Sequence, residues 1–382
     1  MASSHEVLVS PHEIPAGPSQ RQYWADNLRV LVITVVVVWH TAVVYLGVGD
    51  TPSYYEERTT STLWPAVFAP ATIISIFALG PLFLVAGWFS ARSLARKGPG
   101  AFARARLLRL GVPLIVYIFL INPLADYLGH LRKSPHPSLA HWLSFDYAAG
   151  LMWFVAALLA CSLVYALLRS VRPAPVAHRW SGAQAMVAAA VLIAVTAFVV
   201  WQRWTLGNPS SFAHLRWDYW PQGAGLFALG VWAGEAGSWE DLTAWAPRLG
   251  WIALAAAAVF AAVGVSEKMH GHDPSSALRG TSWLPMGGVV LYGIISVAFT
   301  VWFTALIRAR WSGHGPLRAR AGRASYAAYI LNDLVITAIA VLFAALALAP
   351  ELKFLIVAAV AVPACYLIGY AATRVPGVSK VL

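Results

Sequence analysis

Long hydrophobic runs separated by short polar connections form the main pattern along the chain. A transmembrane helix needs about 20 consecutive apolar residues, whereas barrel strands alternate over segments of roughly ten residues. The pattern therefore predicts an all-α polytopic membrane bundle of about ten transmembrane helices. A cytoplasmic N-terminal segment (1–27) and a cytoplasmic tail (374–382) would flank this transmembrane domain (28–373). We expect helices at 28–47, 66–89, 107–128, 148–168, 183–202, 220–236, 248–265, 285–307, 324–348 and 352–373.

The sixth predicted helix has the weakest sequence signal of the ten. Its run QGAGLFALGVWAG is short and rich in glycine. Glycines let two helix backbones approach closely in a membrane, but such a short run is also typical of a helix that does not cross completely. The sequence leaves both interpretations open.

Composition and charge support the membrane assignment and set its orientation. The 382 residues are 59% hydrophobic and 11% charged, with a mean hydropathy of +0.66, which excludes an ordinary soluble domain. With the N-terminus inside, most of the 27 Lys and Arg residues fall in inner connections, as the positive-inside rule requires. We therefore expect both termini in the cytoplasm and a multi-pass protein of the inner or plasma membrane. The net charge of +11 is then explained by the basic inner connections. We expect membrane lipid as a partner and no nucleic acid.

One histidine, His40, lies deep inside a hydrophobic run, LRVLVITVVVVWHTAVVY. Arg29 precedes it by about three helical turns, so both side chains share one face and lie about 16 Å apart along the axis. An ionisable group at that depth indicates function, and imidazole can take a proton from a hydroxyl. A neutral histidine that only hydrogen-bonds between helices is the structural alternative.

A second ionisable group, Asp333, lies in the ninth predicted helix within SYAAYILNDLVITAIAVLF. About ten residues into this helix, it should reach a depth comparable to that of His40. Its carboxylate could orient the imidazole and stabilise the protonated ring. An ion pair with an arginine is the structural alternative.

Arg106 and Arg109 lie three residues apart, on one face of the start of the third helix. The guanidinium fork matches phosphate oxygens, so the pair could bind a donor such as coenzyme A. The same residues would also follow from topology alone, because inner connections are basic.

We expect no metal site. The two cysteines, Cys161 and Cys365, lie inside apolar runs and have the character of small hydrophobic residues. Histidines of the outer connections lack cysteine partners and tight helical spacing, so they are expected to be solvated. These are His130, His136, His141, His270 and His272.

Five blocks, in order, resemble the acyltransferase 3 family of membrane proteins. YWADNLRVLVITVVVVWHTAVVY resembles the family's opening, including that of its glucan-modifying branch, and carries Arg29 and His40. GPLFLVAGWFSARSL resembles its second-helix motif, and Arg106 with Arg109 resembles its arginine pair before the third helix. LMWFVAALL and SYAAYIL resemble two further blocks.

The resemblance implies transfer of an acyl group, usually acetyl, from cytoplasmic acyl-coenzyme A to a hydroxyl of a carbohydrate or similar acceptor. His40 would be the catalytic residue, with Arg29, Arg106 and Arg109 at the donor. Whether His40 acts as a base or forms an acyl-imidazole stays open, and glycans, lipids and small molecules all remain possible acceptors.

Two positions depart from the family pattern. The family often has a histidine where this chain has Leu151, and another where it has Asn332. If those histidines shape the acceptor site, the acceptor or the activity differs here.

Two other classes of protein are compatible with the sequence. A proton-coupled secondary transporter could use His40 and Asp333 as a relay, although the chain shows no evident symmetry between its halves. A membrane scaffold without catalytic activity would have little use for either group.

Overall fold

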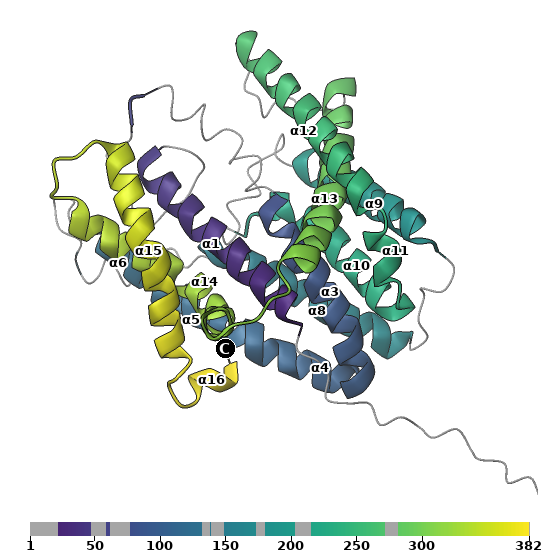
Figure 1. Cartoon of the computed structure of the whole chain (residues 1–382), viewed down its shortest axis with the longest axis horizontal. Coiled ribbons are helices and arrows are strands. Elements are labelled where there is room, and N and C mark those ends of the chain that lie inside the picture. The colour runs from purple at the N-terminus through teal and green to yellow at the C-terminus, as the bar shows by residue number, and fades with distance from the viewer. Residues whose placement is uncertain are drawn as a thin grey trace, which may run out of the picture.

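The computed structural model describes residues 22–46, 59–61, 77–131, 138, 149–172, 180–202, 215–271 and 282–381, and every regular element in these ranges is a helix (Figure 1). Eight of the described helices are long and apolar enough to cross a membrane. The predicted all-α membrane bundle is therefore confirmed, whereas the total number of crossings and the side of each terminus stay predictions. The eight are Tyr23–Leu46 (α1), Pro99–His130 (α4 to α6), Gly150–Val171 (ending in α8, Trp153–Val171), Gly182–Gln202 (α9), Ala246–Met269 (α12), Trp283–Arg310 (α13), Pro316–Phe343 (α14) and Pro350–Ala372 (α15).

The second and sixth predicted helices correspond to α3 (Gly80–Lys97) and α10 (Trp220–Ala236). Residues 66–76 of the second prediction lie outside the described residues. The shorter elements are the helices α11 (Trp239–Thr243) and α16 (Val378–Val381) and the 3₁₀ segments η3 (Gly150–Met152) and η7 (Trp217–Tyr219).

The boundaries of α14 differ from the predicted 324–348. The helix begins at Pro316, where the missing N–H of proline costs nothing because the first turn has no intrahelical acceptor for it. Its first turns carry Arg318, Arg320 and Arg323. These charges lower the hydropathy, so a prediction from apolar runs places the start too late.

Helix α1 lies inside the bundle, between α15 and α13 (Figure 1), and it packs along α14 and α15. Leu28, Val32 and Val37 are each at most 2% exposed. The hydroxyl of Tyr366 on α15 also donates to the carbonyl oxygen of Val30 on α1, at 2.7 Å. The helix that carries His40 is therefore fixed by neighbours on several sides.

Glycines of α10 and α3 allow these two helices to pack closely against each other. A Cβ atom on Gly230 would lie 2.0 Å from the carbonyl oxygen of Leu84 on α3, and one on Gly87 would lie 2.1 Å from that of Phe227 on α10. Only glycine permits two helix backbones to approach this closely. Tight packing against α3 thus explains the glycine-rich run of the sixth predicted helix.

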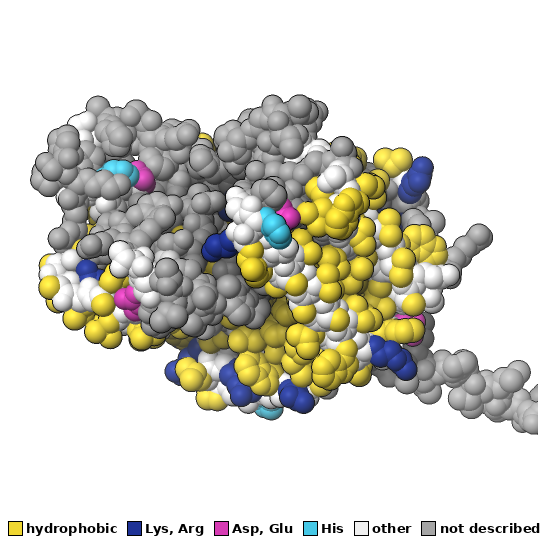
Figure 2. Space-filling model, turned by 90° about the horizontal axis from the view of Figure 1, so that it is seen from above, with side chains coloured by type: hydrophobic (Ala, Val, Ile, Leu, Met, Phe, Trp, Pro, Cys, Tyr) yellow, Lys and Arg dark blue, Asp and Glu magenta, His cyan; other side chains and the backbone are white. Residues whose placement is uncertain are grey.

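Much of the described surface is apolar. Figure 2 shows one face on which hydrophobic side chains cover most of the described area. On α12, for example, Trp251 is 74% exposed and Leu254 is 60% exposed. A soluble protein would not leave a continuous surface of this kind in water, whereas lipid tails cover it without cost.

Replacing Gly230 by alanine should destabilise the bundle by about 2 kcal/mol or more, because the new Cβ collides with the backbone of α3. Thermal unfolding in detergent measures the effect as a lower melting temperature. Gly100→Ala on α4 (Pro99–Arg106) is the matched control, since its Cβ would meet no atom within 4 Å. Equal melting temperatures for the two variants would contradict the close contact of α3 and α10.

Candidate functional site

His40 faces α14. Its Nδ1 atom lies 2.7 Å from Oδ1 of Asn332, a hydrogen bond between the C-terminal half of α1 and the middle of α14. Asn332 is 1% exposed, whereas His40 keeps partial exposure. The imidazole is therefore held inside the bundle by a polar partner rather than directed at lipid.

The orientation of the Asn332 amide follows from its second contact. Its Nδ2 atom donates to the carbonyl oxygen of Tyr329, one turn earlier on α14. Because only the nitrogen of an amide can donate to a carbonyl, the oxygen is the atom that faces His40. Asn332 was noted in the sequence only as a departure from the family pattern, and its contact with His40 is a finding of the structure.

Asp333 lies beside this contact and has its own partner. The carboxylate is 5% exposed, and its Oδ2 accepts a hydrogen bond from the hydroxyl of Tyr117 at 3.1 Å. The structure therefore places Asp333 at the level of His40, since Asn332 precedes it directly. Its predicted role in orienting the imidazole stays a prediction, and Asn332 is the residue that bonds His40 here.

Four polar residues of α14 form one edge of that helix, which we call the polar edge. Tyr326 donates to the carbonyl oxygen of Arg109 at 2.9 Å, and Tyr329 donates to that of Leu151. Asn332 and Asp333 follow one turn later. From Tyr326 to Asn332 the helix rises about 9 Å, so the polar edge connects the arginine pair to the level of His40.

The helix opposite the polar edge is irregular where the contacts occur. From Pro99 to His130 the chain runs on through two π-helical segments, η1 (Leu107–Gly111) and η2 (Tyr117–Ile121). Pro113 has no N–H for the carbonyl four residues earlier, which is that of Arg109, and the Tyr326 hydroxyl satisfies this oxygen. π-Helical segments are frequent at functional sites, and here η1 contains Arg109 and η2 begins at Tyr117.

Arg106 is held in place, whereas Arg109 is exposed. The Nη2 atom of Arg106 donates to Oγ of Ser90 on α3 at 2.8 Å, and its guanidinium carbon lies 5.1 Å from the centre of the Phe102 ring. Ser90 in turn donates to the carbonyl oxygen of Ala86 at 2.7 Å. Ser90 lies in the FSAR stretch of the second-helix block, but the sequence does not reveal that it contacts Arg106.

Arg29 lies toward the start of α1 and pairs with Asp26 at 3.2 Å, with 41% of its side chain exposed. A Cβ atom on Gly322 would lie 3.1 Å from Cβ of Asp26. Since Asp26 lies against Gly322 and His40 against Asn332, α1 and α14 run in the same direction. Arg29 and Arg109 therefore lie toward the N-terminal end of α14, and His40 faces its middle.

In the part of the chain that the structure describes, no group of three or more His, Cys, Asp or Glu side chains could hold a metal ion. His130 is the last residue of α6 (Asn122–His130), and its Nδ1 lies 2.8 Å from the carbonyl oxygen of Asp126. The sequence predicts His130 in a connection, whereas the structure places it at the end of a helix. Three of the other histidines, His136, His141 and His272, lie outside the described residues.

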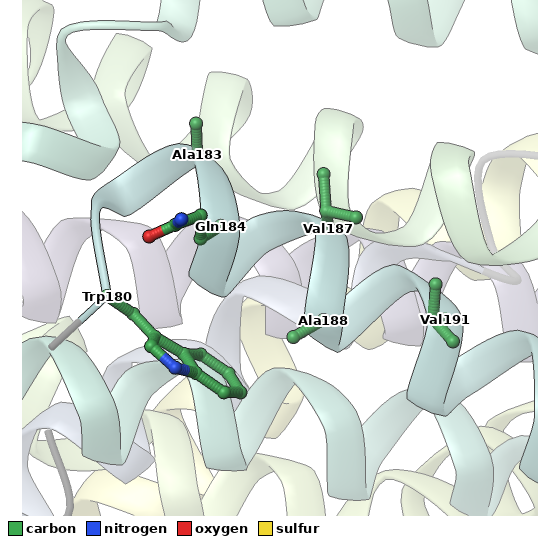
Figure 3. A pocket seen from close by; sticks show the side chains of 6 residues that line it. All are labelled: Trp180, Ala183, Gln184, Val187, Ala188 and Val191. Atoms are coloured by element: carbon green, nitrogen blue, oxygen red, sulfur yellow. The ribbon is translucent and has the colours of Figure 1, made fainter.

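An apolar depression of the surface lies on α9, and none of its lining residues belongs to α1 or α14. Figure 3 shows the Trp180 ring beside this helix, below Gln184. No titratable side chain lines the depression, so it does not resemble a catalytic site. The lining residues are Trp180, Ala183, Gln184, Val187, Ala188 and Val191.

Together, the helices and the buried polar edge define a polytopic membrane protein with an ionisable centre inside its bundle. The chain belongs to the acyltransferase 3 family, because the model of this family, described as an acyltransferase domain, matches residues 22–370. The fold and the family model thus agree on a membrane-embedded acyltransferase domain.

Curated relatives are distant. Glucans biosynthesis protein C of Salmonella paratyphi B is 22% identical over 154 residues, which make up 38% of this chain and 38% of that protein. The same protein of Salmonella heidelberg gives the same values. The chain thus covers 38% of the length of these relatives. No solved structure matches the chain.

Replacing Tyr117 by phenylalanine should lower the free energy of unfolding by about 1–3 kcal/mol, because the carboxylate of Asp333 loses a buried donor. Thermal unfolding in detergent measures the loss. Tyr370→Phe is the control, because the Tyr370 hydroxyl accepts its hydrogen bond from Arg374 at an exposed site. A Tyr117→Phe variant as stable as the control would contradict the assigned contact.

Proposed function

We propose that this protein transfers an acyl group, most simply acetyl, from cytoplasmic acyl-coenzyme A to a hydroxyl of a carbohydrate or similar acceptor. The observation that carries the proposal is the imidazole of His40, held inside the bundle by Asn332 in a chain of an acyltransferase family. Imidazole is the side chain best suited to move a proton near neutral pH.

The proposed reaction needs one proton acceptor. His40 takes the proton of the acceptor hydroxyl while the hydroxyl oxygen attacks the thioester carbonyl carbon. The carbon–sulfur bond then breaks, and the proton passes from the imidazolium to the leaving thiolate. The products are an ester and free coenzyme A. An acyl-imidazole route would use the same ring and give the same products.

The arginines are proposed to bind the phosphates of the donor. Arg106 is pre-oriented by Ser90, and Arg109 follows three residues later with an exposed side chain. Their helix is tied to α14 through Tyr326, and α14 also carries the partner of His40. A donor held by its phosphates at this end could therefore extend its acyl arm along the polar edge. Arg29, at the same end of α14, would add a third positive charge.

The acceptor is proposed from the relatives. Glucans biosynthesis protein C is named for glucan synthesis, which favours a carbohydrate hydroxyl. We propose the cell membrane as the location, with the donor side in the cytoplasm, because the basic connections would then face inward.

His40→Gln should reduce acyl transfer by at least about a hundredfold, because glutamine cannot accept the hydroxyl proton. Transfer of labelled acetyl from acetyl-coenzyme A to a glucan, with hydrolysis of the thioester followed in parallel, measures the effect in purified protein. His270→Gln is the control, because His270 is exposed at the end of α12. Undiminished turnover in a His40→Gln protein of normal melting temperature would overturn the proposed mechanism.

Arg106→Gln should raise the KM for acyl-coenzyme A about tenfold to a hundredfold, because a charged hydrogen bond to phosphate contributes about 1.5–3 kcal/mol. Ser90→Ala should raise it less, since the arginine keeps its charge and loses only its anchor. Steady-state kinetics with varied donor concentration provide the values. Arg310→Gln, at the exposed end of α13, is the control. If Arg310→Gln raised the KM as much as Arg106→Gln, general surface charge would explain the effect.

A further inference from the structure

The hydrogen bonds around Asn332 determine which nitrogen of His40 carries the proton. An amide side chain offers two N–H donors on Nδ2 and an acceptor oxygen on Oδ1. The Nδ2 atom is directed at the backbone carbonyl of Tyr329, so Oδ1 is the atom left for the imidazole. An oxygen of this kind only accepts, and the Nδ1 atom of His40 must therefore be the donor in the 2.7 Å contact.

A neutral imidazole carries one proton. With that proton on Nδ1, the lone pair lies on Nε2, at the far side of the ring from Asn332. We propose that Asn332 is a positioning residue that fixes His40 in the Nδ1–H form and makes Nε2 the reactive nitrogen. The assignment of the proton stands on geometry alone, whereas its catalytic meaning rests on the proposed acyl transfer.

The surroundings of Asn332 keep its amide from turning over. The carbonyl that it contacts belongs to the backbone of α14 and cannot donate. The side chain of the same residue, Tyr329, is 3% exposed and bonds the carbonyl oxygen of Leu151, while its ring packs against Phe154 with 5.9 Å between centroids. A flipped amide would direct its nitrogen at His40 and two oxygens at each other, which costs the free energy of a lost buried hydrogen bond.

This role depends on the residue being asparagine. The resemblance to the family leads one to expect a histidine at this position, and a histidine can present either a donor or an acceptor to its neighbour. The asparagine, with its nitrogen occupied, can present an acceptor only. Replacing the expected histidine thus removes one ionisable group and leaves a single arrangement of protons at His40.

The direct test is the protonation pattern of the ring. Protein labelled with ¹⁵N-histidine in lipid nanodiscs is compared by NMR with His40→Gln, so that the two nitrogen signals of His40 are identified by difference. At a pH where the ring is neutral, we expect the Nδ1 signal to be that of a protonated nitrogen and the Nε2 signal that of an unprotonated one. The opposite pattern in the wild-type protein would overturn the proposal, whatever the activity.

Variants separate positioning from folding. Asn332→Leu removes the acceptor at similar size, so both tautomers should be populated and kcat should fall on the order of 100-fold, while the KM for acetyl-coenzyme A stays within about twofold. Asn332→Asp restores an acceptor, and we expect it to restore the Nδ1–H signal. Because its carboxylate favours the protonated ring, we expect kcat to recover only as the pH is raised. Asn27→Leu is the matched control, because this buried asparagine of α1 bonds the carbonyls of Trp311 and Gly313 at a distance from the ring. It should leave the His40 signals unchanged.

The outcomes distinguish the two proposals. Wild-type protein that shows the Nδ1–H pattern but transfers no acyl group to any tested hydroxyl would reject the proposed function and leave the assignment of the proton standing. Protein that transfers acyl groups normally in Asn332→Leu would reject the positioning role while supporting the function.

Discussion

The absence of water inside a bilayer is the constraint on which the described structure depends. A donor or acceptor there that finds no partner within the protein costs several kcal/mol. Along the polar edge of α14, each contact meets such a need. Tyr326 satisfies the carbonyl that Pro113 leaves open, Tyr329 satisfies that of Leu151, and Asn332 holds a titratable ring that would otherwise be desolvated without a partner.

The same rule governs the charged groups elsewhere. Arg169 on α8 is 9% exposed, and its Nε atom donates to Glu235 at the end of α10 at 2.8 Å, while Tyr165 donates to the same carboxylate at 2.6 Å. Both charges lie near helix ends, where a pair costs least to desolvate. His40 and Asp333 differ because they lie further from the helix ends, six residues before the end of α1 and ten residues before the end of α14. That position has no advantage for stability, which favours a functional reason for keeping them.

The sequence was sufficient for the all-helical membrane fold and for the place of His40 within a helix, because both depend on local composition. An apolar run of helical length stands out by itself, and so does a lone imidazole within it. The sequence could not reveal that Asn332 bonds His40, that Tyr117 bonds Asp333 or that Ser90 bonds Arg106, since each contact joins two different helices. The depth of Asp333 could be predicted from the rise per residue. Its partner could not, because depth does not tell which face of a helix meets which neighbour.

The adjacent residues Asn332 and Asp333 of α14 bond different partners. It matters for the chemistry that the amide, and not the carboxylate, bonds His40. A carboxylate bonded to the imidazole would favour a protonated ring, since a buried positive charge is stabilised by a negative one beside it, and a protonated ring cannot accept another proton. The neutral amide of Asn332 orients the ring without supplying that charge, while Tyr117 donates to the carboxylate of Asp333. In the proposed reaction, a centre built in this way would start as a neutral base that can accept the proton of an approaching hydroxyl.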